Sequence, residues 1–179
     1  MSAMTASPTP ADFPSLYFRS ALGRFPTGVT IVTAEHPDTG VPLGLTISSF
    51  SSVSLAPPMV LWALTHTASS LAAFLSLDRY VIHVLSASQI DLARRFAKGP
   101  QADRFTDLPL DRAPNGTLML GDTRCAAWFE CHNTQRHRAG DHTIFVGQVE
   151  HCHRQLLSPL IYHAGDFELT PASEPLSRN

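Results

Sequence analysis

A run of hydroxyl side chains is a dense group of polar residues that could hold a ligand. It extends from Thr46 to Ser54 and contains Thr46, Ser48, Ser49, Ser51, Ser52 and Ser54. A strand that turns into a loop with this many hydroxyl and backbone N–H groups can surround a phosphate group without glycine residues. The same residue types are also typical of ordinary turns and helix caps, so the run alone leaves both interpretations open.

A second candidate anion site lies at residues 67–70. Thr67, Ser69 and Ser70 precede an expected helix, and the unpaired N–H groups and dipole of such a terminus favour a negative charge. Arg94 or Arg95 could supply a positive charge. The sequence has neither a G-x-G-x-x-G motif after a strand nor a G-x-x-x-x-G-K-[ST] motif, so a bound phosphate would have to be held by groups of these kinds.

The sequence Gly140-Asp141-His142 stands just before the apolar run at 144–146. A histidine at the entrance of a strand, beside a turn glycine, can project into a cleft while the aspartate orients its ring. The same three residues could equally be a structural turn. No serine stands in a G-x-S-x-G motif, and no Ser/His/Asp or Cys/His arrangement for nucleophilic catalysis is evident.

Nine histidines raise the question of a metal site, above all in Glu150-His151-Cys152-His153. On a strand, His151 and His153 would share one face while Cys152 points to the other. The sequence has no C-x-x-C pair, which structural zinc sites commonly use. We therefore predict no metal site and interpret these histidines as solvated residues near a strand end.

The elements that must position these residues are mostly short strands. Alternating or β-branched apolar residues predict strands at 29–34, 43–50, 59–64, 80–85, 118–120, 126–131, 143–151, 160–163 and 167–169. Helices are expected at 15–23, at 89–98 after a capping box of Ser88 and Asp91, and after Ser69 or Ser70 with Leu71, Phe74 and Leu75 inward. Residues 99–116 carry three prolines and indicate an irregular surface excursion. This pattern predicts a mainly β fold with short helices, in which an antiparallel barrel is decorated by helices.

Composition bounds the class of protein. The chain has 179 residues, of which 44% are hydrophobic and 16% charged, with a net charge of −2. One globular domain is expected at 15–170, between a disordered leader at 1–14 and a polar tail at 171–179. The charge disfavours nucleic-acid binding, and the apolar runs are too short to span a membrane. Three irregularly spaced cysteines indicate reduced thiols and a cytoplasmic location, and the low charged fraction favours burial against a second copy.

Several stretches in consistent order carry a resemblance to a known family. They are residues 25–33 (FPTGVTIVT), 44–58 (GLTISSFSSVSLAPP), 96–97 (FA), 103–105 (DRF), 130–131 (EC), 140–147 (GDHTIFVG) and 160–163 (LIYH). Together they resemble the flavin-reductase-like family of FMN-binding split β-barrels, the short-chain reductases that serve flavin-dependent hydroxylases. The resemblance implies a Greek-key-like antiparallel barrel.

The resemblance also implies roles by position. Segments 26–30 and 46–49 would contact the isoalloxazine and ribityl chain, and residues 69, 70, 95 and 96 would lie near the flavin phosphate or in the adjoining wall. The nicotinamide nucleotide would face Gly140, Asp141, His142 and Thr143, with His142 as the catalytic residue beside the stacked rings. The complete flavin site implied in this way is Pro26, Thr27, Gly28, Val29, Thr30, Thr46, Ile47, Ser48, Ser49, Ala63, Leu64, Ser69, Ser70, Arg95 and Phe96.

The activity implied by the resemblance is that of an NAD(P)H:flavin oxidoreductase. Such an enzyme transfers a hydride from NADH or NADPH to FMN or FAD and supplies reduced flavin to a separate monooxygenase. Split barrels of this kind usually complete the flavin site at the interface of a homodimer. An FMN-holding electron-transfer protein and a non-catalytic flavin-binding module remain alternatives at this point.

Overall fold

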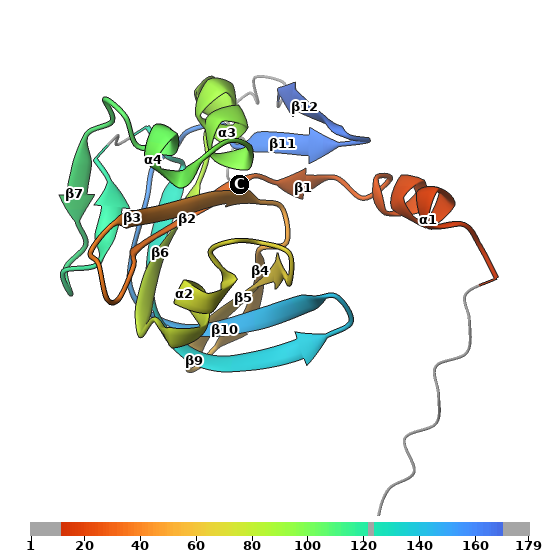
Figure 1. The fold of residues 1–179 in the computed structure, drawn as a ribbon. Helices are drawn as coiled ribbons and strands as arrows, with labels where there is room; N and C mark the ends of the chain where they lie inside the picture. Colours follow the sequence, from red (N-terminus) through yellow and green to blue (C-terminus); the bar gives the residue numbers. More distant parts are fainter. Residues whose placement is uncertain (1–11, 122–123, 170–179) are drawn as a thin grey trace, which may run out of the picture.

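A seven-stranded antiparallel sheet that curls into a barrel is the main feature of the computed structural model, which describes residues 12–121 and 124–169 (Figure 1). The strand order is β3-β2-β6-β9-β10-β5-β4. The bounds are β2 Thr30–Glu35, β3 Pro42–Ile47, β4 Ser51–Leu55, β5 Pro58–Thr65, β6 Arg79–Val84, β9 Ala127–Ala139 and β10 His142–Arg154. The consecutive strands β3 and β4 stand at opposite ends of this order, so the barrel is split between them.

The corner at residues 48–50 crosses this split. The hydroxyl of Ser49 donates to the Ala63 carbonyl at 3.1 Å and accepts from the Ala63 N–H at 3.0 Å. The regular pairing of β4 with β5 begins only at Ser51 and Leu61. The Ser49 side chain therefore replaces one step of the ladder and holds the corner against β5.

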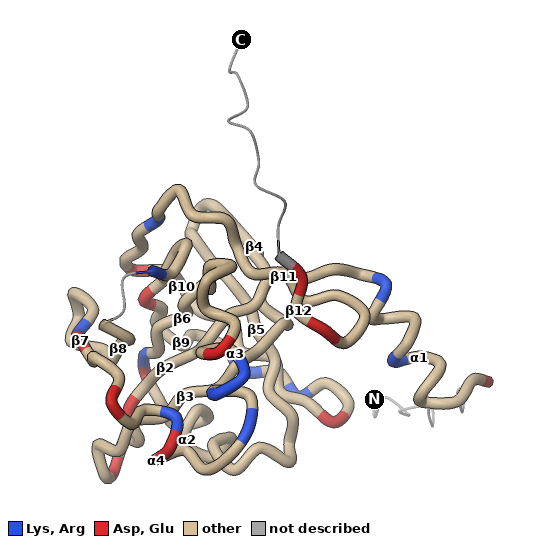
Figure 2. Tube along the Cα trace, turned by 90° about the horizontal axis from the view of Figure 1, so that it is seen from above, with Lys and Arg blue, Asp and Glu red and all other residues tan. Residues whose placement is uncertain are grey.

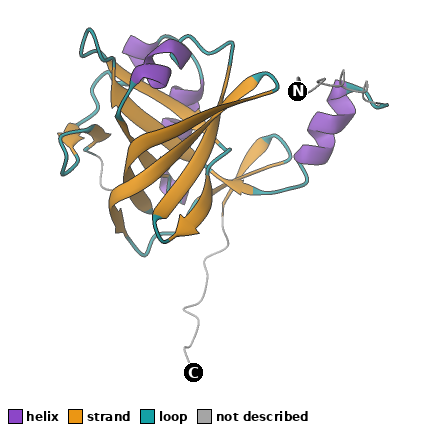
Figure 3. Cartoon of the chain, turned by 90° about the horizontal axis from the view of Figure 1, so that it is seen from below, coloured by secondary structure: helices purple, strands orange, loops and turns teal. Residues whose placement is uncertain are grey.

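Two small sheets complete the β structure. One pairs β1 Thr27–Gly28 with β11 Leu160–His163, and β11 with β12 Asp166–Leu169. The other pairs β7 Leu110–Arg112 with β8 Leu118–Leu120. The first sheet brings β11 and β12 beside the N-terminal segment β1 (Figure 1). Phe167 of β12 contacts Arg94 of α3. Figure 3 shows the strands of the barrel from below, with the helices around them.

Apolar side chains fill both faces of the central strands. Inside the barrel, the Trp62 ring stacks on the Phe145 ring, with centroids 4.6 Å apart and 14° between the planes. Val32 of β2 belongs to this inner cluster, whereas its neighbour Ile31 packs in a second cluster that contains Phe96. Because successive residues of a strand face opposite sides, a strand buried on both faces has a continuous apolar sequence.

Four α-helices of the described residues lie outside the barrel or beside it. They are α1 Ser15–Leu22, α2 Leu71–Ser76, α3 Ile90–Ala97 and α4 Gln101–Arg104, and the short 3₁₀ helix η1 Ala87–Gln89 precedes α3. Figure 1 shows α3 and α4 above β3, and Figure 2 shows basic residues gathered on α3. The helix α1 projects away from the barrel and has no buried residue. Its Leu16 is 78% exposed and its Tyr17 69% exposed.

The glycine at position 44 allows α3 and α4 to approach β3 closely. A Cβ atom there would lie 2.5 Å from Cε1 of Phe96 and 2.7 Å from Cζ of Phe105. Both polar backbone groups of Gly44 are used: its N–H donates to Oε1 of Gln101 at 3.0 Å, and its carbonyl accepts from Nη1 of Arg104 at 2.7 Å. The Thr46 hydroxyl donates to the Ala93 carbonyl at 2.7 Å, so side chains satisfy the outer edge of β3 and fasten the helices to it.

The predicted antiparallel barrel with short helices is confirmed, with corrections to individual elements. The strand expected at 43–50 ends at Ile47, and β4 follows as a separate strand. The irregular stretch at 99–116 contains α4 and β7. The strands expected at 126–131 and 143–151 are parts of β9 and β10, which have 13 residues each. The expectation missed residues 132–139 of β9, which are mostly exposed, and residues 152–154 of β10, which are all exposed.

Two expected side-chain roles also differ. The capping box before α3 uses Ser86 and Gln89, rather than Ser88 and Asp91, because the chain enters through the 3₁₀ turn η1. Leu75 is 41% exposed, whereas Phe74 is fully buried. The expected leader at 1–14 and tail at 171–179 lie mainly or wholly outside the described residues, and the domain bounds stay a prediction.

A buried histidine makes folding sensitive to acid. His83 of β6 is 1% exposed, and its Nε2 lies 3.1 Å from Oγ1 of Thr33, which donates to the Leu118 carbonyl at 2.8 Å. Burial lowers the pKa of His83 from 6.5 to about 3. The unfolded chain therefore binds a proton more readily than the folded chain, and the stabilisation present above pH 6.5 is lost as the pH falls toward 3.

Below the pKa that His83 has in the unfolded chain, the free energy of unfolding should fall more steeply with pH in the wild type than in His83→Gln. We predict a difference of about 1.4 kcal/mol for each pH unit. Urea denaturation of both proteins at several pH values between neutrality and mild acid measures this difference. Parallel pH dependences for the two proteins would show that His83 does not remain neutral in the folded state.

Candidate functional site

Two adjoining pockets open on either side of the C-terminal end of β3. The first has a volume of about 430 Å³ and is called the hydroxyl pocket. The second has a volume of about 460 Å³ and is called the cationic pocket. Thr46, Ile47, Ser48 and Ala97 line both pockets and form a shared wall.

The hydroxyl pocket lies at the split of the barrel. The end of β3, the end of β5, the loop before α2, and the helices α3 and α4 each contribute to its lining. It brings together ten residues that the sequence analysis assigned to the site: Thr46, Ile47, Ser48, Ser49, Ala63, Leu64, Ser69, Ser70, Phe96 and His142.

The hydroxyl groups of this pocket fall into two sets. Those of Thr46 and Ser49 are engaged with Ala93 and Ala63, as described above. Within the described part of the chain, the side chains of Ser48, Ser69 and Ser70 show no hydrogen bond, and Ser70 does not cap α2. These three hydroxyls therefore remain available for a ligand.

Arg104 is the cationic side chain of the hydroxyl pocket. Its guanidinium donates to the carbonyl of Gly44 at 2.7 Å and to that of Gly99 at 2.8 Å. Its Nε is buried without a hydrogen-bond partner among the described residues, and burial lowers the pKa of this group. An arginine side chain keeps its charge in proteins even when it is partly buried, so the guanidinium stays positively charged at neutral pH.

The structure does not place Arg95 in the lining of either pocket. Its guanidinium donates to the carbonyl of Asp103 at 2.9 Å and to that of Thr106, so it fastens the segment after α4 instead. Arg95 follows Arg94 on α3, and neighbouring positions of a helix point in different directions. Arg94 lines the cationic pocket.

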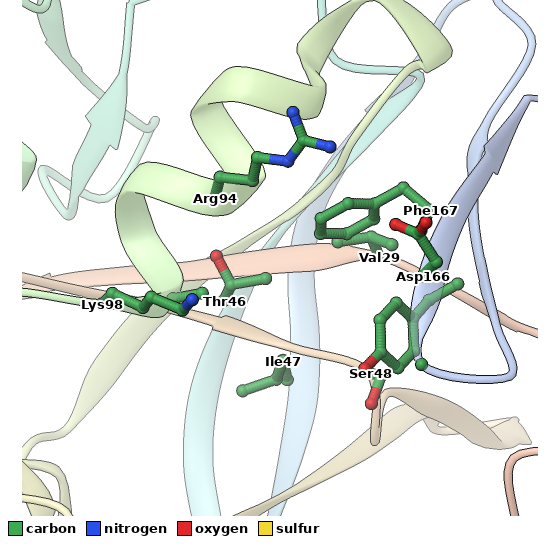
Figure 4. Close-up of a pocket in the computed structure, with 11 residues that line it drawn as sticks. Val29, Thr46, Ile47, Ser48, Arg94, Lys98, Asp166 and Phe167 are labelled. Atoms are coloured by element: carbon green, nitrogen blue, oxygen red, sulfur yellow. The ribbon is translucent and has the colours of Figure 1, made fainter.

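The cationic pocket combines positive and aromatic side chains. Figure 4 shows Arg94 and Lys98 extending from α3, Asp166 and Phe167 on the opposite side from β12, and the end of β3 between them. The guanidinium carbon of Arg94 lies 5.7 Å from the centre of the Phe167 ring. Such a wall suits an aromatic base and a phosphate group.

The turn between β9 and β10 carries His142 to the edge of the hydroxyl pocket. Nδ1 of His142 lies 2.6 Å from Oδ1 of Asp141, and both side chains are exposed. This contact with the imidazole lowers the pKa of the Asp141 carboxyl. Gly140 has a positive φ of 59°, which allows the tight turn. Thr143 is buried in the strand, so of residues 140–143 only His142 lines the pocket.

Segment 26–30 lies largely behind the pockets. Val29 lines the cationic pocket, whereas Pro26, Thr27, Gly28 and Thr30 line neither pocket. Thr27 and Gly28 form β1, which pairs with β11. Sequence analysis did not assign Gln101, Arg104, Lys98, Tyr162, Asp166 and Phe167 to the site.

Comparison with known proteins decides the family. The sequence model described as "Flavin reductase like domain" matches residues 22–170. The chain belongs to this family. As a flavin reductase like domain, it is 43% identical over 150 residues to FMN reductase (NADH) SmoA of Agrobacterium fabrum, a match that covers 84% of this chain and 83% of SmoA. It is 40% identical to the stachydrine N-demethylase reductase subunit Stc3 of Rhizobium meliloti, over 83% of this chain and 63% of that protein.

Solved structures of flavin reductase like domains have the same fold. The NADH:FAD oxidoreductase SgcE6 of Streptomyces globisporus, in complex with NAD and FAD fragments, superposes with a TM-score of 0.79 at 31% identity, over 89% of this chain and 94% of that one. Flavin reductase PheA2 gives a TM-score of 0.79 at 30% identity, over 89% and 99% of the two chains.

The expected absences concern a metal site and a membrane-spanning helix. Among residues 12–121 and 124–169, no three His, Cys, Asp or Glu side chains are grouped as metal ligands would be. The prediction that the protein needs no metal remains a prediction. No helix within those residues is both long enough and apolar enough to cross a membrane.

The two hydrogen bonds between Ser49 and Ala63, which hold the corner at residues 48–50 against β5, lead to a stability prediction. Ser49→Ala removes a donor and an acceptor for Ala63 and should lower the free energy of unfolding by about 1 kcal/mol. Ser48→Ala is the matched control, since the Ser48 hydroxyl has no partner in the described structure, and it should leave stability unchanged. Urea denaturation compares the variants, and equal stabilities for both would contradict the role of the corner contact.

Proposed function

We propose that this chain is an NADH-dependent flavin reductase that supplies reduced flavin to a separate monooxygenase. The observation that carries the proposal is the pair of pockets that share the wall at residues 46–48. Two ligands in pockets with a common wall can bring their reactive rings together, and hydride transfer requires such contact. SmoA, whose name gives FMN and NADH, is similar over most of this chain.

The hydroxyl pocket fits a flavin mononucleotide. Ser48 would hydrogen-bond to the ring system or ribityl chain, and Ser69 and Ser70 would donate to the phosphate. Arg104 would neutralise the phosphate charge, in the place that the sequence analysis gave to Arg95. Thr46 and Ser49 would contribute through backbone groups and shape, because their hydroxyls are engaged within the protein.

The cationic pocket fits the nucleotide half of NADH. Arg94 and Lys98 would hold the pyrophosphate, and Phe167 and Tyr162 offer aromatic faces to the adenine. His142, at the edge of the hydroxyl pocket, would contact the nicotinamide end. Together the two bound groups supply hydride transfer, so the protein needs to align them and exclude other geometries rather than to provide an acid and a base.

FMN and NADH are the ligands we favour over FAD and NADPH. SmoA and the NADH:FMN oxidoreductase of Rhodococcus erythropolis carry these ligands in their names. The 2′-phosphate of NADPH would bring further negative charge, and Asp166 in the cationic pocket would oppose it.

A second copy and a monooxygenase are the proposed partners. The exposed apolar residues of α1 and the segment after it, Leu16, Tyr17, Phe18, Leu22 and Phe25, supply a surface suited to a homodimer. A similar protein of Acinetobacter baylyi is named as the reductase component of a flavin-dependent trigonelline monooxygenase, and Stc3 as the reductase subunit of stachydrine N-demethylase. The cytoplasm, where NADH is available, is the proposed location.

The proposed activity predicts oxidation of NADH when FMN is added, followed by absorbance at 340 nm under air. His142→Ala should raise the KM for NADH or slow flavin reduction by about tenfold, while the Kd for FMN stays within about twofold. Stopped-flow reduction of FMN separates the two effects. An inactive wild type would contradict the proposed function. A His142→Ala variant with wild-type kinetics would contradict the role of His142.

The phosphate site predicts a difference between FMN and riboflavin. Arg104→Gln should raise the Kd for FMN by about tenfold or more, since charge-assisted hydrogen bonds contribute about 1.5–3 kcal/mol. Riboflavin lacks the phosphate, so its Kd should not change. Arg95→Gln, which also loses bonds to backbone carbonyls, is the matched control and should bind FMN as the wild type does. A loss of riboflavin affinity equal to that of FMN would show that Arg104 acts through pocket shape.

A further inference from the structure

His66 lies at the junction of the two loops that flank the hydroxyl pocket. It follows β5 directly, and the last residue pair between β5 and β10 is Thr65 with His142. Beyond this pair, the N–H of His66 donates to the Asp141 carbonyl at 2.8 Å. Its ring Nε2 lies 3.2 Å from Oγ1 of Thr143. One residue therefore contacts both chain neighbours of His142.

The two contacts have different anchors. Thr143 is buried in β10, opposite Leu64 of β5, and its hydroxyl has no other hydrogen bond in the described structure. Asp141 is exposed and belongs to the two-residue turn between the paired residues Ala139 and His142. The turn stands at the end of a hairpin whose neighbouring residues 135–142 are largely exposed. His66 thus connects this exposed turn to the body of the barrel.

These contacts bear on the orientation of the His142 ring. The ring is held at Nδ1 by the Asp141 carboxylate, and the main chain of Asp141 is held by His66. The side chain of His66 in turn is fixed by Thr143. A histidine that is nearly half exposed has many accessible orientations, and each fixed neighbour reduces their number.

We propose that His66 is a positioning residue that holds the His142 turn in place for the nicotinamide nucleotide. The inference rests on the proposed function, since it assigns His142 to that ligand. His66 does not line either pocket, so it acts through residues 141–143 and not by contact with a substrate.

The alternative is a purely structural role in the loop at residues 66–70. The chain leaves His66 through a turn in which the Ala68 N–H donates to the Thr65 carbonyl at 3.1 Å, and Ser69 and Ser70 follow in the hydroxyl pocket. If the His66 side chain mainly supports this loop, its loss should weaken FMN binding and lower thermal stability. If it positions His142, its loss should affect NADH and leave FMN nearly unchanged.

The test compares four variants of the full chain. His66→Ala should raise the KM for NADH about fivefold, the effect of one neutral hydrogen bond, with kcat and the Kd for FMN within about twofold of wild type. His66→Gln, whose amide reaches as far as Nε2, should restore the wild-type KM. Thr143→Val should match His66→Ala, and the double variant should be no worse than either, because both remove the same contact.

The matched control is His137→Ala, at an exposed histidine of the same hairpin whose side chain bonds only to Gln135 in the described structure, and it should have wild-type kinetics. An unchanged KM in His66→Ala, or equal losses in FMN affinity and NADH kinetics, overturns the inference. Additive effects of His66→Ala and Thr143→Val overturn it as well. If the wild type itself does not oxidise NADH, the proposed function fails, which is a different result from a failure of the inference on His66. Calorimetry of NAD⁺ binding to the FMN-loaded wild type distinguishes the two cases.

Discussion

The outer edge of β3 determines where the pockets can form. An edge strand presents unpaired N–H and C=O groups, and in this protein Gln101, Arg104 and Thr46 connect that edge to α3 and α4. The connection requires a glycine at position 44, because any Cβ would overlap the rings of Phe96 and Phe105. With the helices fixed at this distance, α3 lines both pockets beside the end of β3, and α4 lines the hydroxyl pocket. A strand with a larger residue here would push the helices outward and remove that wall.

The serine-rich run has two separate tasks, and burial does not distinguish them. Ser49 closes the corner between β3 and β5, whereas its neighbour Ser48 faces both pockets. Only the position of the next strand decides which hydroxyl is engaged. The separation of these tasks explains how a polar corner can be both rigid and able to bind a ligand.

Sequence reasoning reached the fold because the strands follow simple patterns. β2 and β6 are buried and rich in β-branched residues, and β5 is an apolar run with every second residue buried. The family resemblance, carried by motifs such as Gly140-Asp141-His142, proved correct. The largely exposed strand β4 and the outer part of β9, residues 132–139, were missed, since an exposed strand has no apolar period to detect.

The sequence predicted most hydroxyl-bearing residues of the site, but not all of its basic and aromatic residues. Ten residues of the hydroxyl pocket had been assigned to the site from the hydroxyl-rich segments or from the resemblance, whereas Gln101 and Arg104 had not. Arg104 and Phe167 were not assigned because their roles depend on how α4 and β12 fold back toward β3, over sequence separations of about 60 residues or more. Arg94 and Arg95 could not be told apart from the sequence either. They project from different sides of α3, so Arg94 lines the cationic pocket and Arg95 bonds to the Asp103 carbonyl.

The shared wall at residues 46–48 also limits how this protein can be redesigned. A larger side chain at Ile47 would narrow both pockets at once, so a gain in selectivity for one ligand would come with a change in affinity for the other. Independent adjustment is possible only at residues that face a single ligand, such as Ser69 and Gln101 on one side or Lys98 and Asp166 on the other. Directed evolution of a new cofactor preference should therefore begin at these outer positions and leave the common wall intact.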